Sequence, residues 1–152
     1  MKQNRKMTKI SPHSGIIKEN IHHFPLRVYY EDTDVGGVVY YANYLKFMER
    51  ARSEMLKVLG IDQKAMLDYN KPDDVSFVVR HAEIDFKQAA RFDDELIVNT
   101  EIIKLGGASI VMKQIISKDG ILLVESIIKA AVIGQDGKPK RLPKAIADKL
   151  NV

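Results

Sequence analysis

The sequence has no cysteine and only four histidines. The absence of cysteine excludes disulfide bonds, thiolate zinc sites and a cysteine nucleophile, and it suits a reducing cytoplasm. His13, His22 and His23 lie near the N-terminus, and His81 lies alone in a strand pattern. Because no two histidines have the spacing of a zinc motif such as H-E-x-x-H, we expect no metal site.

Long apolar runs and phosphate-binding glycine loops are also missing. No apolar segment approaches the roughly 20 residues of a transmembrane helix, and the N-terminus lacks the apolar core of a signal peptide. Gly36-Gly37 and Gly106-Gly107 lack the spaced glycines and the lysine of nucleotide-binding loops. We therefore expect a cytoplasmic protein with no integral membrane segment and no nucleotide-binding loop.

Acidic residues are scarce at the N-terminus. Within residues 1–22 the only acid is Glu19, and the bases are Lys2, Arg5, Lys6, Lys9 and Lys18. This arm supplies about the whole net charge of +4. We expect it to be a mobile, solvated tail rather than a patch that binds nucleic acid. Residues 23–152 have the length of one domain, and 45% hydrophobic with 29% charged residues is typical of a globular chain.

A long amphipathic helix is predicted from Tyr41 to Leu59. Apolar residues recur at three- and four-residue steps, namely Tyr44, Leu45, Met48, Ala51, Met55 and Leu59. Asn43 is a candidate N-cap, and Gly60 suits the left-handed position after the helix. Shorter helices are predicted over 62–69 and 143–150.

Period-two alternation predicts strands at 26–30, 82–87, 96–102, 110–114 and 121–133. Hairpin signals at Gly106-Gly107 and Asp119-Gly120 join the last three strands into an antiparallel meander. One long helix with about five strands indicates an α+β fold in which a curved antiparallel sheet wraps the helix. At least a dimer is expected, because apolar residues also alternate outward, such as Ile97, Ile103, Val111 and Ile115.

Three carboxylates, Glu31, Asp32 and Asp34, precede Gly36-Gly37 and the long helix. The first turn of a helix has N–H groups without intrahelical partners, and these groups stabilise nearby negative charge. A carboxylate beside a helix start therefore combines a base or nucleophile with donors for a developing oxyanion. We expect the chemistry of the protein in this segment.

The segments YYEDTDVGGVVYYANYLKFMERAR and VVRHAEIDFKQAARFDDEL resemble the 4-hydroxybenzoyl-CoA thioesterase family of hotdog-fold proteins, and within it the acyl-CoA thioesterases encoded with the Tol-Pal envelope system. The resemblance covers most of the chain, and the arm before His23 lies outside it. It implies a hotdog fold with sites at the interface of a homodimer or homotetramer. The implied activity is hydrolysis of an acyl-CoA or acyl carrier protein thioester to free acid and thiol, without a cofactor.

The resemblance also implies roles for Asp34 and Tyr41. In the family the last aspartate of the acidic segment is the catalytic carboxylate, and the peptide N–H at or next to Tyr41 meets the thioester carbonyl. Attack by Asp34 on the carbonyl and activation of a water by Asp34 both remain open. Many Tol-Pal-associated relatives carry histidine where this chain has Tyr41, and a phenol with a reference pKa near 10 does not replace an imidazole base.

Other residues have structural and functional interpretations. Glu31 and Asp32 are expected to order the loop or to face solvent, because one carboxylate suffices. Tyr40 and Tyr44 are expected in the core or an interface, with an acyl tunnel as the alternative. Glu49 is a candidate structural acid that faces the sheet. Four basic residues have two interpretations, either as solvated charges or as contacts to the phosphates of coenzyme A. They are Arg80, His81, Lys87 and Arg91.

Two further function classes compete with hydrolysis. A non-catalytic hotdog module would hold acyl-CoA or acyl carrier protein for phospholipid metabolism or the cell envelope, and would release no thiol. The hypothesis that the protein binds nucleic acid rests on the net charge alone. Dehydration of a hydroxyacyl thioester normally needs a histidine and an acid, and no histidine lies near the acidic segment.

Overall fold

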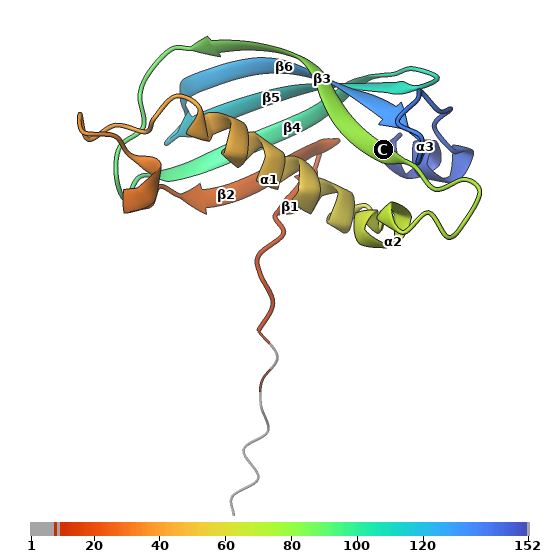
Figure 1. The fold of residues 1–152 in the computed structure, drawn as a ribbon. Helices are drawn as coiled ribbons and strands as arrows, with labels where there is room; N and C mark the ends of the chain where they lie inside the picture. Colours follow the sequence, from red (N-terminus) through yellow and green to blue (C-terminus); the bar gives the residue numbers. More distant parts are fainter. Residues whose placement is uncertain (1–7, 9, 152) are drawn as a thin grey trace, which may run out of the picture.

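A curved sheet wraps the helix α1 (Figure 1). The computed structural model describes residue 8 and residues 10–151. The strands are β1 (Ile16–Lys18), β2 (Ile21–Arg27), β3 (Ser76–Phe86), β4 (Glu95–Leu105), β5 (Ser109–Lys118) and β6 (Ile121–Ile133). The helices are α1 (Asn43–Val58), α2 (Gln63–Leu67) and α3 (Lys144–Leu150), and a short 3-10 helix is η1 (Tyr30–Asp32). None of the helices in this part of the chain has both the length and the apolar character that crossing a bilayer requires.

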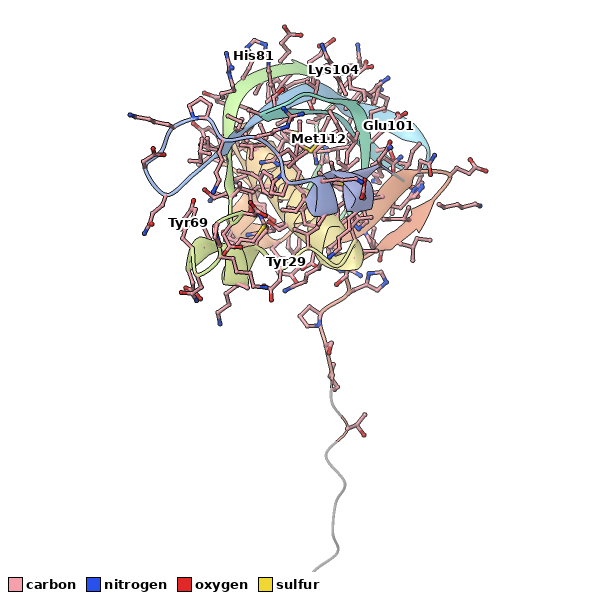
Figure 2. The ribbon with its side chains drawn as sticks, turned by 90° about the vertical axis from the view of Figure 1, so that its right-hand side faces the viewer. Tyr29, Tyr69, His81, Glu101, Lys104 and Met112 are labelled. Carbon is pink, nitrogen blue, oxygen red and sulfur yellow. The ribbon has the colours of Figure 1, made fainter. Side chains whose placement is uncertain are left out.

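The sheet confirms the predicted α+β hotdog architecture, with six described strands rather than about five. All pairings are antiparallel, in the spatial order β1-β2-β4-β5-β6-β3. The predicted meander corresponds to β4, β5 and β6, and Asp119-Gly120 forms its second turn with φ of +48° and +77°. In Figure 2 Met112 points inward toward α1, whereas His81, Glu101 and Lys104 point away from it.

Helix α1 buries one face against the inside of the sheet. Its buried residues are Tyr44, Phe47, Met48, Ala51, Met55 and Leu56. Leu45, which we expected on this face, is 45% exposed. Gly60 has a φ of +76° after the helix, as predicted. The prediction that Asn43 caps α1 is wrong, because Asn43 is already helical and its side-chain amide donates to the Asp32 carbonyl. The N-cap is Ala42, which makes no side-chain cap bond.

The N-terminal boundary of the domain needs a correction. The expected arm, 1–22, overlaps the sheet, because residues 16–18 form β1 and 21–22 begin β2. Residues 1–7 and 9, which hold most of the arm's positive charge, lie outside the described residues. The expected strand at 26–30 is shifted as well, since β2 ends at Arg27 and Tyr30 begins η1.

The structure confirms that apolar residues alternate onto the outer face of the sheet. Ile97 is 36% exposed and Ile103 is 49% exposed, while Val111 and Ile115 are partly exposed. The other face carries the core, with Leu96, Val98, Ile116 and Val124 fully buried. One face of the sheet therefore packs on α1, and the opposite face has no helix over it among the described residues.

A buried polar network fixes α1 across the middle of the sheet. The Gln114 amide donates to the Met48 carbonyl at 3.0 Å and to the Thr100 hydroxyl at 2.9 Å, and it accepts from Arg52 at 2.9 Å. Ser126 donates to the Gln114 carbonyl at 2.9 Å. A network of satisfied buried groups specifies one arrangement, because a shifted helix would leave these groups without partners.

His22 lies under the β1–β2 hairpin and is 1% exposed. Its Nε2 donates to the Ser14 carbonyl at 2.7 Å, and its Nδ1 has no partner among the described residues. Burial lowers the pKa of His22 from 6.5, although the Ser14 carbonyl and the charge of Glu54 on α1 oppose this effect. The folded state therefore favours neutral His22.

We predict that this histidine makes the protein less stable in mild acid. Because the pKa of His22 is lower in the folded state than 6.5, the unfolded state takes up a proton first as the pH falls. The stability that neutral His22 contributes is therefore complete above pH 6.5 and is lost as the pH falls through the folded-state pKa. The free energy of unfolding, measured with urea at about pH 7.5 and about pH 5.5, should fall more in the wild type than in His22→Gln, which keeps a donor for Ser14. Equal losses in the two proteins would contradict the prediction.

Candidate active site

The acidic segment folds into a tight turn between η1 and α1. Thr33 and Val39 form an isolated antiparallel bridge. Inside it, the Asp34 N–H donates to the Val38 carbonyl at 2.9 Å, and the Gly37 N–H donates to the Asp34 carbonyl at 3.0 Å. Gly37 has a φ of +76°, which explains the glycine at this position. The turn places Asp34 at an exposed corner of the molecule.

The two aspartates of the segment have different surroundings. Asp34 Oδ1 accepts the Gly36 N–H at 2.8 Å, and its Oδ2 makes no hydrogen bond within the described chain. Asp32 is buried, and its Oδ2 accepts the Tyr29 N–H at 2.8 Å. Asp32 thus orders the loop as expected, Glu31 is exposed, and Asp34 alone combines a fixed backbone with an accessible carboxylate oxygen.

The start of α1 is tied directly to this turn. The Asp32 carbonyl accepts the Tyr40 N–H at 3.0 Å and the Asn43 side-chain amide at 2.9 Å. The first backbone bonds of the helix run from Asn43, Tyr44 and Leu45. In the part of the chain that is described, the N–H groups of Tyr41 and Ala42 donate to no acceptor. The helix start therefore offers free donors close in sequence and space to the acidic turn.

Aromatic rings line the approach to these donors. The Tyr41 ring lies 5.0 Å from Tyr40 and 6.0 Å from Phe86 at the end of β3, and Phe86 lies 5.7 Å from Tyr44. Tyr40 is 47% exposed and Tyr41 is 61% exposed. Tyr44 is buried, its hydroxyl accepts the Ala90 N–H at 2.9 Å, and burial raises its pKa above 10.0. Tyr44 is therefore a core residue that stays neutral, whereas the rings of Tyr40 and Tyr41 remain accessible.

The basic residues that we considered for coenzyme A phosphates have different surroundings. His81 pairs with Glu83 at 3.1 Å, and Lys87 pairs with Asp85 at 2.9 Å. Arg80 is an exposed residue at the β-bulge between Val79 and His81, on the edge strand. Arg91 differs from these residues, because its backbone forms a bridge with Val38 in the acidic turn. Arg91 is thus joined to the candidate site through its backbone, and Lys87 directly follows Phe86, whose ring contacts Tyr41.

Asp94 fixes the segment that carries Arg91. Its Oδ2 accepts the Arg91 N–H and its Oδ1 accepts from Lys118, both at 2.8 Å. Burial alone would raise the pKa of Asp94, but these hydrogen bonds outweigh burial and lower it. The carboxylate therefore stays charged and holds the segment against the acidic turn.

Other parts of the described chain offer weaker candidates. A hollow of about 1060 Å³ lies near α2 and α3, and neither the acidic turn nor the aromatic residues line it. Its lining mixes acidic and basic residues without one chemical character. No group of three or more histidine, aspartate or glutamate side chains within the described ranges is arranged for a metal ion. Glu49, expected to face the sheet, is exposed and accepts from Ser53 at 2.8 Å, so that expectation is wrong.

Solved thioesterase structures share this architecture. A probable thioesterase from Bartonella henselae superposes with a TM-score of 0.77 at 42% identity, over 81% of this chain and 99% of that one. A 4-hydroxybenzoyl-CoA thioesterase superposes with a TM-score of 0.79 over 86% of this chain and 99% of that one, but its 16% identity supports the fold alone.

Sequence comparison identifies the family. Residues 36–125 match the thioesterase superfamily, and the chain belongs to this superfamily. The acyl-CoA thioesterase YbgC of Haemophilus influenzae is 42% identical over 124 residues, which are 81% of this chain and 89% of that protein. The acyl-CoA thioester hydrolase YbgC of Escherichia coli is 43% identical over 125 residues, covering 81% and 90%. The resemblance seen in the sequence is therefore confirmed at the level of the family.

Proposed function

We propose that the protein hydrolyses acyl-CoA thioesters and that Asp34 and the start of α1 form its catalytic centre. Membership of the thioesterase superfamily and 42% identity to an acyl-CoA thioesterase support the reaction class. The observation that carries the site is the junction at Asp32, where one carbonyl binds both the Tyr40 N–H and the Asn43 amide. This junction keeps an accessible carboxylate and free helix donors in one small region.

The chemistry follows from these two groups. As a nucleophile adds to the thioester carbonyl carbon, negative charge develops on the carbonyl oxygen, and the Tyr41 N–H with the positive end of the α1 dipole stabilises it. When this intermediate collapses, the C–S bond breaks and the sulfur leaves as a thiolate, which takes up a proton to become the thiol. Asp34 either attacks the carbonyl carbon to form a mixed anhydride, which water then hydrolyses, or removes a proton from the attacking water. Both routes release a free acid and a thiol. Tyr41 contributes through its backbone, since a phenol does not act as a base near neutral pH.

Replacing Asp34 by asparagine should abolish most turnover while preserving the fold. Asparagine retains an oxygen that accepts the Gly36 N–H but has neither the charge nor the basicity of the carboxylate. We expect kcat for acyl-CoA hydrolysis to fall about 100-fold or more, measured with a thiol-trapping dye. Glu31→Gln, which changes an exposed acid of the same segment, is the control and should retain activity. Full turnover by Asp34→Asn would remove Asp34 from its proposed role.

The donor role of Tyr41 can be separated from its side chain. Tyr41→Ala removes the ring and keeps the peptide N–H, whereas Tyr41→Pro removes the N–H as well, at a position just before the helix where proline is tolerated. The proline variant should lose about 10²–10³-fold more kcat than the alanine variant. Circular dichroism of both variants checks that α1 still forms. Equal activities in two folded variants would show that the N–H does not act on the substrate.

We also propose that the protein is a homodimer joined through β3. This strand is 11 residues long, lies at an edge of the sheet and is exposed over most of its length. Val78 is 46% exposed and Val79 is 44% exposed. A long apolar edge is a template for a further strand, and two copies related by a two-fold axis pair the same strand with itself. The opposite edge, β1, has only three residues.

Sedimentation velocity tests the dimer and its interface. The wild type should sediment as a dimer, and Val78→Lys on the β3 edge should shift it toward the monomer, because lysine discourages edge pairing. Ile97→Lys, on the outer face of the sheet, is the matched control. A dimer broken by Ile97→Lys but not by Val78→Lys would assign the interface to the outer face. Cytoplasmic location, use of acyl carrier protein and the Tol-Pal link stay predictions from the sequence.

A further inference from the structure

A cavity of about 280 Å³ lies beside α1 on the side of β3. Its walls are largely apolar and come from several elements, including Met55, Phe77, Val79 and Met112. Glu49, Ser53 and Gln63 are polar residues of the lining. Arg52 of α1 also lines this cavity. A charged guanidinium against an apolar cavity is unusual, because charged side chains are rarely buried without a partner.

The partners of Arg52 satisfy only part of its hydrogen-bonding capacity. One Nη1–H donates to Gln114 Oε1 at 2.9 Å, and no other hydrogen bond or ion pair of the guanidinium occurs within the described residues. A guanidinium has five N–H donors and stays charged in proteins. Burial lowers the pKa of Arg52 and nearby Glu49 opposes this, but Glu49 binds Ser53 instead of forming an ion pair with Arg52. Gln114 fixes one side of Arg52 and leaves donors for a ligand.

The cavity is also placed to receive the far end of a substrate. Tyr41 lies two residues before α1, and Arg52 is the tenth residue of this helix. The nine residue steps from Asn43 to Arg52 rise about 13 Å along the axis. Strand β3 joins the same two places, because Phe86 at its end contacts Tyr41 while Phe77 and Val79 line the cavity. The direction from the Tyr41 N–H along α1 and β3 therefore leads toward the cavity that Arg52 lines.

We propose that Arg52 recognises the distal end of the acyl group, and that the preferred substrates are acyl thioesters whose tail ends in an oxygen acceptor, a carboxylate above all. This inference rests on the proposed thioesterase function and names the substrate class of that site. The apolar walls bind the methylene chain, and the free N–H groups of Arg52 bind the terminal oxygens. Carboxylates are favoured because a guanidinium binds them through two parallel hydrogen bonds. A methyl-ended tail leaves these donors unpaired.

The test compares matched acyl-CoAs that differ only at the end of the tail. One pair is octanoyl-CoA with suberyl-CoA, and the other is dodecanoyl-CoA with dodecanedioyl-CoA. The CoA thioester of ω-hydroxydodecanoic acid shows whether a terminal hydroxyl is recognised as well as a terminal carboxylate. The measured quantity is the ratio of kcat/KM for the carboxylate-ended over the methyl-ended member. We expect this ratio to be about tenfold or more in the wild type for at least one pair. Arg52→Met should lower the ratio at least about tenfold, and Arg52→Lys, which keeps the charge without the fork, should restore part of it.

Arg50→Met is the matched control, because Arg50 is an exposed arginine of the same helix outside the cavity. Its ratio should equal that of the wild type. A ratio near one for every pair in the wild type, or an unchanged ratio in folded Arg52→Met, would overturn the proposal. If no thioester is hydrolysed, the proposed thioesterase function is contradicted, but the role of Arg52 is not yet tested. Calorimetric binding of the same acyl-CoA pairs to the wild type and to Arg52→Lys then decides that role.

Discussion

The carbonyl oxygen of Asp32 is the point on which the arrangement of the site depends. It accepts one hydrogen bond from the Tyr40 backbone and one from the Asn43 side chain, so it joins the acidic turn to the first residues of α1. A catalytic carboxylate and its oxyanion donors need relative positions that are held to a fraction of an ångström. Here a short local connection supplies that constraint, because Asp34 lies two residues after Asp32 and Tyr41 follows directly after Tyr40.

The position of the whole helix depends in turn on the buried network around Gln114. One amide binds the Met48 carbonyl, the Thr100 hydroxyl and the Arg52 guanidinium, and so connects α1 to β4 and β5. This network holds α1 at Met48 and Arg52, and Arg52 also lines the cavity beside β3. Gln114 therefore has two roles. It fixes the helix over the sheet, and it orients Arg52 so that the remaining donors of the guanidinium are free for a ligand.

Local patterns in the sequence predicted the helix, the meander and the acidic turn, because each depends on residues close together in the chain. The β1–β2 hairpin was missed because Glu19 and Asn20, rather than glycines, adopt the positive φ values of its turn, 52° and 63°. Asn43 was misjudged as a cap because its partner, the Asp32 carbonyl, is set by the fold of the preceding loop. The pairing of Arg52 with Gln114 spans 62 residues, and no local pattern predicts it.

A structure of Asp34→Asn with an intact acyl-CoA bound tests the central claim most directly, because the slow variant preserves the thioester. The account predicts that the thioester oxygen lies about 3 Å from the Tyr41 backbone nitrogen, with the carbonyl carbon next to the side chain at position 34. A thioester bound away from the start of α1, or residue 34 turned away from it in every protomer of the assembly, would contradict the account.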